Sequence, residues 1–224
     1  MDVYYLVLVV PTLLLSMWAQ IKVKSTFAKY SKVPCSRGIT GQGAAALLMK
    51  TNKINDVKIE PVRGSLTDHY APSTKMLRLS EPVYGSTSIA AIGVAAHEAG
   101  HAIQHAVRWG PLAMRSTLVP VANIGSALGP WIAIAGIFLS FPILINIGIL
   151  LFSGAVLFYI ITLPVEFNAS NRAIAILRAN HVLTEEELKG VRKVLSAAAL
   201  TYVASALTAI ASLLRLVLMS GRRR

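Results

Sequence analysis

The feature that most constrains the fold is a long stretch without charge: no Asp, Glu, Lys or Arg occurs between residues 116 and 165. A transmembrane helix needs about 20 predominantly apolar residues, so this stretch can hold two spans. The run Ser140 to Pro142 divides it near its middle. We expect spans at about 118–139 and 143–164. Because their connection is short, they should form an antiparallel hairpin that returns the chain to the side it left.

Two further apolar segments lie near the ends of the chain. Residues 3–19 are apolar apart from Thr12 and Ser16, and lysines follow them at positions 22, 24, 29 and 32. A cleaved signal peptide has the opposite charge order, so we expect a first transmembrane helix with a cytoplasmic basic flank. Residues 195–214 form a fourth helix. If it spans the membrane, Arg222-Arg223-Arg224 lies outside, against the positive-inside rule. If it lies in the interface, Arg215 snorkels.

Composition supports a membrane protein. Charged residues make up 14% of the chain, against about 25% in soluble domains. The net charge of +12 fits the positive-inside bias, and no aromatic and basic platform indicates nucleic-acid binding. The single cysteine, Cys35, excludes an internal disulfide. We therefore expect one mainly α-helical, multi-pass unit over residues 1–224 in the inner or plasma membrane, with the lipid bilayer as a partner and no nucleic acid.

The region 20–115 is polar and holds 13 Lys and Arg against 5 Asp and Glu. Turn residues and apolar periodicity predict a small subdomain of two helices and two strands in this region. The expected elements are a helix at about 44–50, strands at 57–62 and 76–80, and a helix at about 89–107 that begins after the capping residues Ser86, Thr87 and Ser88 and is stopped by Gly110-Pro111.

A second polar segment, residues 166–194, follows the uncharged stretch. Glu166 to Ala179 has a helical pattern. Thr184 and Glu187 have the spacing of a capping box, so the acidic run at 185–187 is interpreted as the start of a helix and not as a metal site.

The chemistry is concentrated at His97-Glu98-Ala99-Gly100-His101. Two histidines four residues apart lie on one face of a helix, and both imidazoles can reach one Zn²⁺ at about 2.0–2.1 Å. Glu98 follows the first ligand and can take a proton from the zinc-bound water, whose pKa the metal lowers towards about 7. Gly100 allows the backbone of another element to approach closely.

A catalytic zinc site needs a third protein ligand and an open fourth position. His105 lies on the same helix, two turns from His97, so the three histidines cannot converge on one ion. Glu166 is the better candidate because it is the first charge after the uncharged stretch, and a carboxylate at a span boundary is costly without a partner. Asp68 and Glu81 are weaker alternatives.

Several motifs together resemble the bacterial neutral zinc metallopeptidase family of membrane proteins. The likeness covers nearly the whole chain. More distantly, the chain is similar to the membrane heat-shock proteases and the CAAX prenyl-protein endopeptidases. The matching segments are Asp68 to Pro72, Leu77 to Ser80, Val94 to His105 and Pro164 to Ser170.

The resemblance implies a zincin-like fold around the metal, a gluzincin-like metalloendopeptidase and peptide-bond hydrolysis. In the wider group the downstream segment reads Glu-x-x-x-Asp, where the Glu binds zinc and the Asp supports a ligand histidine. Glu166 matches the ligand. Ser170 stands at the Asp position, and Asn168 or Asn171 could substitute for the missing support.

The sequence therefore predicts a zinc-dependent membrane endopeptidase in which His97, His101 and Glu166 bind the metal and Glu98 is the general base. A tetrahedral oxyanion also needs a hydrogen-bond donor. The candidates by residue type are His69, Tyr70 and Arg172, and for each a structural hydrogen bond is the alternative. Met76 to Ser80 is either an edge strand that binds extended substrate or an ordinary strand.

The expected substrate is a peptide or a membrane protein, cleaved on the cytoplasmic side, and a homo-oligomer is possible. Two other functional classes compete with the enzyme. A zinc-stabilised scaffold or partner subunit would need a closed site with a fourth protein ligand, such as His69 or His105. A transporter would need ionisable residues within its spans, and the middle pair has none.

Overall fold

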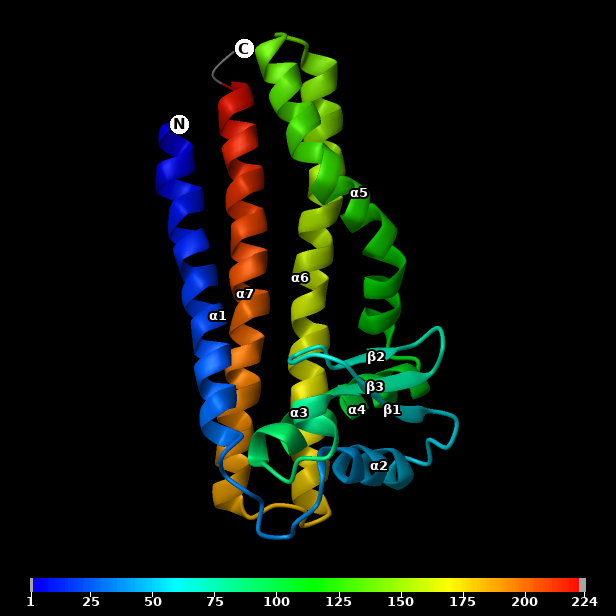
Figure 1. Cartoon of the computed structure of the whole chain (residues 1–224). Helices are drawn as coiled ribbons and strands as arrows, with labels where there is room; N and C mark the ends of the chain where they lie inside the picture. Colours follow the sequence, from blue (N-terminus) through cyan, green and yellow to red (C-terminus); the bar gives the residue numbers. More distant parts are fainter. Residues whose placement is uncertain (1, 222–224) are drawn as a thin grey trace. The chain divides into compact units, whose positions relative to one another are not determined.

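The computed structural model describes residues 2–221, so the terminal Arg222-Arg223-Arg224 lies outside the described residues (Figure 1). The chain is mostly helical and contains one small sheet. The helices are η1 (Tyr5–Val9, a π-helix), α1 (Val10–Tyr30), α2 (Gly41–Thr51), α3 (Glu81–Tyr84), α4 (Ile89–Ala106), α5 (Gly110–Phe138), α6 (Pro142–Ala179) and α7 (Glu185–Gly221). The strands are β1 (Lys58–Val62), β2 (His69–Ala71) and β3 (Met76–Ser80).

Residue contacts group the chain into two compact units, each made from separate stretches of sequence. The first, here called the apolar unit, contains Met1–Gln20, Gly110–Pro164 and Leu200–Arg224. The second, here called the polar unit, contains Ile21–Trp109 and Val165–Ala199.

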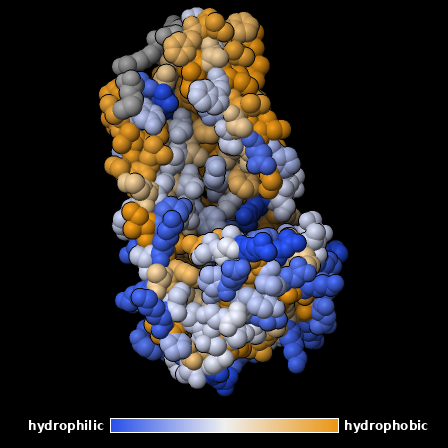
Figure 2. Space-filling model, viewed as in Figure 1, coloured by the Kyte–Doolittle hydropathy of each residue, from blue (hydrophilic) through white to orange (hydrophobic). Residues whose placement is uncertain are grey.

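Within residues 2–221, four helices are long and apolar enough to cross a membrane. They are Tyr5–Tyr30, Gly110–Phe138, Pro142–Ala179 and Glu185–Gly221. The four expected spans are thus confirmed as helices, and the third runs further than expected. Residues 166–179 continue the third span and residues 185–194 lead into the fourth, each without a break. Hydrophobic residues cover much of the surface of the long helices on the face shown in Figure 2.

Glycines set the packing of the α5–α6 hairpin. A Cβ atom added to Gly125 would lie 2.2 Å from the carbonyl oxygen of Leu151, and one added to Gly148 would lie 2.3 Å from the backbone nitrogen of Ala133. Close backbone approach through small residues is the usual way for helices to pack inside a bilayer, where burying apolar surface gives no drive for association. The hairpin expected from the sequence is therefore present as two helices in direct backbone contact.

Arg215, near the end of α7, is paired within the apolar unit. Its Nη2 atom lies 2.6 Å from Oδ2 of Asp2, and its guanidinium carbon lies 5.0 Å from the centre of the Tyr5 ring. Ionisable groups in membrane helices are usually paired in this way. α7 continues past Arg215 to Gly221, as a spanning helix would.

The polar unit contains a three-stranded sheet with the order β1-β3-β2. β1 pairs with β3 in parallel, and β2 pairs with β3 antiparallel. The strands β1 and β3 were expected; β2 was not. β3 is the central strand, so the hypothesis that Met76–Ser80 is a free edge for substrate is wrong, because both of its edges are already paired.

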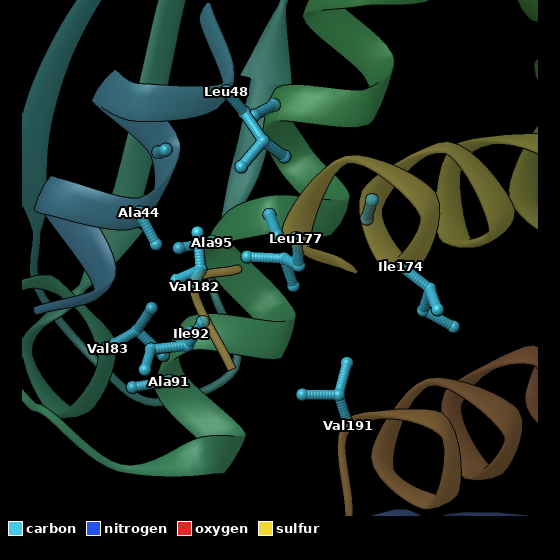
Figure 3. Close-up of a cluster of buried hydrophobic side chains, with 14 of the residues drawn as sticks. Ala44, Leu48, Val83, Ala91, Ile92, Ala95, Ile174, Leu177, Val182 and Val191 are labelled. Carbon is cyan, nitrogen blue, oxygen red and sulfur yellow. The ribbon is translucent and has the colours of Figure 1, made fainter. Parts of the chain in front are cut away.

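Helix α4 lies at the centre of the polar unit, and most of its residues are buried. Ser88 caps its start by accepting a hydrogen bond from the backbone nitrogen of Ala91 at 3.2 Å. Its apolar side chains join one cluster with those of α1, α2, α3, α6, α7 and the strand β3, part of which is drawn in Figure 3. The members drawn there include Leu48 of α2, Ile92 of α4, Leu177 of α6 and Val191 of α7.

Gly100 brings α4 into backbone contact with α6. A Cβ atom at this position would lie 2.6 Å from the carbonyl oxygen of Ala169, closer than carbon and oxygen atoms can pack. The sequence-based expectation that Gly100 permits a close approach is confirmed, and the partner is the helix that carries Glu166.

Replacing Gly100 should therefore weaken this helix crossing. In Gly100→Ala the new methyl group meets a backbone carbonyl, which cannot rotate away, so α4 and α6 must separate. Overpacking of this kind costs about 1–3 kcal/mol, which we expect as a lower midpoint of thermal unfolding in detergent, followed by circular dichroism. Gly85→Ala is the matched control, since a Cβ atom there meets nothing within 4 Å. Equal midpoints for the two variants would contradict the prediction.

Candidate metal centre

Three side chains of the polar unit converge on one point. His97 and His101 lie one turn apart on α4, and Glu166 lies on α6. The Nε2 atoms of the two histidines are 3.2 and 3.5 Å from the same oxygen, Oε2 of Glu166. Among the residues that the structure describes, this is the group whose ligand atoms could hold a metal ion, with all of them within 4.8 Å of one another.

The donor set and its spacing fit zinc. Two imidazoles and one carboxylate are a ligand set found in catalytic zinc sites. Tetrahedral bonds of about 2.0–2.1 Å place neighbouring ligand atoms about 3.3 Å apart, and the two measured separations, 3.2 and 3.5 Å, bracket that value. Glu166 is only 2% exposed, so a cation at this point would also balance a buried negative charge.

Ser170 supports the first histidine. Its hydroxyl oxygen lies 3.0 Å from Nδ1 of His97, one turn of α6 beyond Glu166. This is the position where the wider group resembled by the sequence has Asp, and here a hydroxyl occupies it. Asn168 and Asn171, considered as substitutes from the sequence, do not make this contact: Asn168 bonds elsewhere and Asn171 is exposed.

Gln104 supports the second histidine. Its Oε1 atom lies 3.0 Å from Nδ1 of His101, and its Nε2 atom donates to the carbonyl oxygen of Val165 at 2.8 Å and to Oδ1 of Asn168 at 3.0 Å. Gln104 is fully buried. Sequence reasoning missed this residue. The available signal was its position three residues after His101, which places both on the same side of the helix.

Glu98 is buried on α4, with 9% of its surface exposed. Burial lowers the pKa of the His101 imidazole, but the neighbouring carboxylates of Glu166 and Glu98 outweigh this and raise the pKa above its usual value. Glu98 thus contributes to the negative charge around His101, and it does not belong to the cluster of three residues that could hold a metal ion.

The three candidates for an oxyanion donor have different surroundings. Tyr70, on β2, is half-buried, and its hydroxyl lies 2.7 Å from Nδ1 of His105 on α4. His69 is exposed, with Nδ1 2.8 Å from the carbonyl oxygen of Thr67. Arg172 donates from Nε to Oδ1 of Asn168 at 2.7 Å. Each thus makes the structural hydrogen bond that the sequence left open as an alternative.

The weaker ligand candidates are not part of the cluster. Asp68 accepts hydrogen bonds from the backbone nitrogen and the hydroxyl of Ser80, at 2.7 and 2.8 Å, and so fixes the loop before β2. Glu81 is exposed in the first turn of α3. His105 contacts Tyr70 and does not belong to the cluster of three.

Comparison with known proteins agrees with this geometry. Residues 5–221 match the family model described as "Putative neutral zinc metallopeptidase". The chain is 51% identical over 220 residues to a protein of Bacillus subtilis (strain 168) named "Putative membrane protease YugP", covering 97% of this chain and 98% of the relative. No solved structure matches the chain.

The family model covers nearly every residue that the structure describes, including both helices of the centre. The resemblance inferred from the sequence is confirmed, and with it zinc as the cofactor. This chain belongs to the family of neutral zinc metallopeptidases, and it is a membrane protein.

Proposed function

We propose that the protein is a gluzincin-like metalloendopeptidase of the membrane, which cleaves peptide bonds with Glu98 as the general base. The observation that carries the proposal is the convergence of His97, His101 and Glu166, with ligand-atom separations that suit tetrahedral zinc. In this site the two imidazoles and the Glu166 carboxylate would hold the metal. When bound, zinc polarises the substrate carbonyl and lowers the pKa of a water molecule towards about 7.

Glu98 supplies the proton transfers. Glu98 directly follows His97 in the middle of α4, and its side chain is buried. It accepts the proton of the attacking water and then donates it to the nitrogen of the leaving amine, so that one residue acts first as a base and then as an acid. Burial keeps other water away from this carboxylate, which strengthens its interactions with the reacting groups.

Tyr70 is the best supported of the three candidate donors to the oxyanion. Burial raises the pKa of its phenol to about 12, and the hydroxyl, which is protonated at neutral pH with or without that shift, is a hydrogen-bond donor. The contact with His105 ties Tyr70 to the helix that carries both histidine ligands. His69 and Arg172 remain candidates with weaker support, since one is exposed and the other is engaged with Asn168.

The scaffold alternative has less support. A closed structural site needs a fourth protein ligand, and among the described residues neither His69 nor His105 joins the cluster. Three protein ligands leave a coordination position for water or substrate, which is the arrangement of a catalytic centre. The names of the family and of the Bacillus relative also favour a peptidase.

The location we propose is the inner or plasma membrane, with the active site on the cytoplasmic side. Glu166 and the third candidate span belong to one uninterrupted helix, α6. Basic residues are concentrated in the region 20–115, and basic loops stay in the cytoplasm. The substrates we expect are peptides or membrane proteins presented at or near the bilayer.

Removal of Glu166 should abolish tight zinc binding. Loss of a supporting residue alone weakens metal binding by about 10–100-fold, so Glu166→Ala, which removes a ligand, should lose more than that. The measurement is zinc per chain after dialysis against a chelator. Glu81→Ala, at an exposed carboxylate outside the cluster, is the control and should keep its zinc. Full occupancy in Glu166→Ala would exclude Glu166 as a ligand.

Replacement of Glu98 should separate zinc binding from catalysis. Glu98→Gln keeps the shape of the side chain but cannot accept a proton, so the rate should fall by about 10²–10⁴-fold while the zinc content stays the same. The assay is cleavage of denatured casein by the purified protein in detergent. Activity that survives in Glu98→Gln would sink the proposed mechanism.

The same assay ranks the donors to the oxyanion. Tyr70→Phe should lower kcat by about 10²–10³-fold, the usual effect of removing one such donor, with zinc content unchanged. His69→Ala should have little effect.

The proposed topology predicts which side of the membrane is accessible. In a Cys35→Ser background, Lys58→Cys on β1 should react with an impermeant maleimide only after the inner or plasma membrane has been permeabilised. Arg224→Cys should react in intact spheroplasts if the fourth helix spans the membrane. Labelling of Lys58→Cys from outside would place the polar unit on the wrong side for this proposal.

A further inference from the structure

We infer that Gln104 is a positioning residue that holds His101 in the one tautomer able to bind zinc through Nε2. We infer further that Asn168 and Arg172 hold Gln104 in place. The inference rests on the proposed role of His101 as a ligand. All four residues belong to the polar unit and are joined by hydrogen bonds that run from α6 to α4.

The first step is the orientation of the Gln104 amide. An amide has one end that donates hydrogen bonds and one that accepts them. The carbonyl oxygen of Val165 can only accept, and it lies 2.8 Å from one end of the Gln104 side chain. That end must therefore be the NH₂ group. The same NH₂ group donates its second hydrogen to Oδ1 of Asn168 at 3.0 Å, which leaves the oxygen, Oε1, facing His101.

The second step is the tautomer of His101. Oε1 of Gln104 is 3.0 Å from Nδ1 of His101, and an amide oxygen only accepts. Nδ1 must therefore carry the hydrogen, and in a neutral imidazole the lone pair is then on Nε2. Nε2 is the atom that faces Oε2 of Glu166 at 3.5 Å. The direction of the Gln104 amide thus decides which nitrogen of His101 is available to a metal.

The third step is what holds the amide. Oδ1 of Asn168 accepts from Nε2 of Gln104 and also from Nε of Arg172, at 2.7 Å. The second bond comes from a cation, and charge-assisted hydrogen bonds are shorter and about twice as strong as neutral ones. It fixes Asn168 with its oxygen towards Gln104. Arg172 therefore acts at a distance from the metal centre, through two amides.

The two histidines are held in different ways. Nδ1 of His97 meets the hydroxyl of Ser170 at 3.0 Å, and a hydroxyl can donate or accept. Ser170 therefore keeps the His97 ring in place without deciding its tautomer. Gln104 both holds the His101 ring in place and selects its tautomer. Since a fully buried amide is costly unless all its hydrogen bonds are made, a residue with this environment is better explained by a role in the site than by packing.

The test compares wild-type protein with Gln104→Met, both as full chains in detergent. In zinc-free protein at alkaline pH, where the imidazoles are neutral, nitrogen-15 NMR of labelled histidines should show Nδ1–H at His101 in wild type and a mixture of tautomers in Gln104→Met. The zinc dissociation constant, measured by chelator competition, should rise by about 10–100-fold. A residue that only cross-links the two helices would not move the tautomer.

Two further variants keep the test decisive if Gln104→Met does not fold. Gln104→Glu retains an oxygen acceptor for Nδ1 of His101 and should restore its Nδ1–H tautomer, although it loses the two donors to Val165 and Asn168 and adds a buried charge. Asn168→Ala leaves Gln104 in place but frees its amide, and should raise the dissociation constant by less than the loss of Gln104 does. Gln42→Met, at an exposed glutamine of α2, is the matched control and should change neither quantity.

The possible failures can be told apart. Unchanged tautomer and unchanged zinc affinity in Gln104→Met and Asn168→Ala would overturn this inference while leaving zinc binding by His101 intact. Full zinc binding by His101→Ala would overturn the proposed ligand set itself, and this inference with it.

Discussion

The backbone contact between α4 and α6 is the constraint on which the centre depends. Gly100 and Ala169 meet there, and a single methyl group on Gly100 would collide with the Ala169 carbonyl. On each helix, two polar side chains have the same spacing from the residue at the contact. His97 and His101 flank Gly100, as Glu166 and Ser170 flank Ala169. Two helices that touch at their small residues therefore bring two pairs of polar side chains face to face, and three of the four members form the group that could hold a metal ion.

The parts of the fold that could be predicted from the sequence are those with a local signal. Strand β3 ends where the apolar run ends, α4 begins at its serine cap, and the Thr184–Glu187 capping box forms as expected. The ligand set also follows from local facts. Histidine spacing on one helix and the first charge after an uncharged stretch were enough to select residues that the structure brings together.

The rest depends on contacts between residues far apart in the chain. β2 has three residues and is a strand only because β3 lies beside it, so no periodicity could reveal it. The partners of the histidines are set by the rotation of α6 about its own axis, which hydrophobic pattern fixes only to within a residue or two. That uncertainty is why Ser170, Asn168 and Asn171 all stayed candidates for supporting a histidine, and why the contact of Gln104 with His101 was not predicted.

The side chains that hydrogen-bond His97 and His101 are uncharged, and this has an electrostatic consequence. Zn²⁺ carries two positive charges, and the buried carboxylates of Glu166 and Glu98 carry one negative charge each, so the loaded centre is neutral with both imidazoles uncharged. An aspartate in place of Ser170 would leave a net negative charge in a buried site, where an uncompensated charge costs several kcal/mol. Hydroxyl and amide partners orient the imidazoles without adding that charge. The use of Ser170 and Gln104 therefore suits a centre in which two carboxylates, Glu166 and the proposed base Glu98, are already buried.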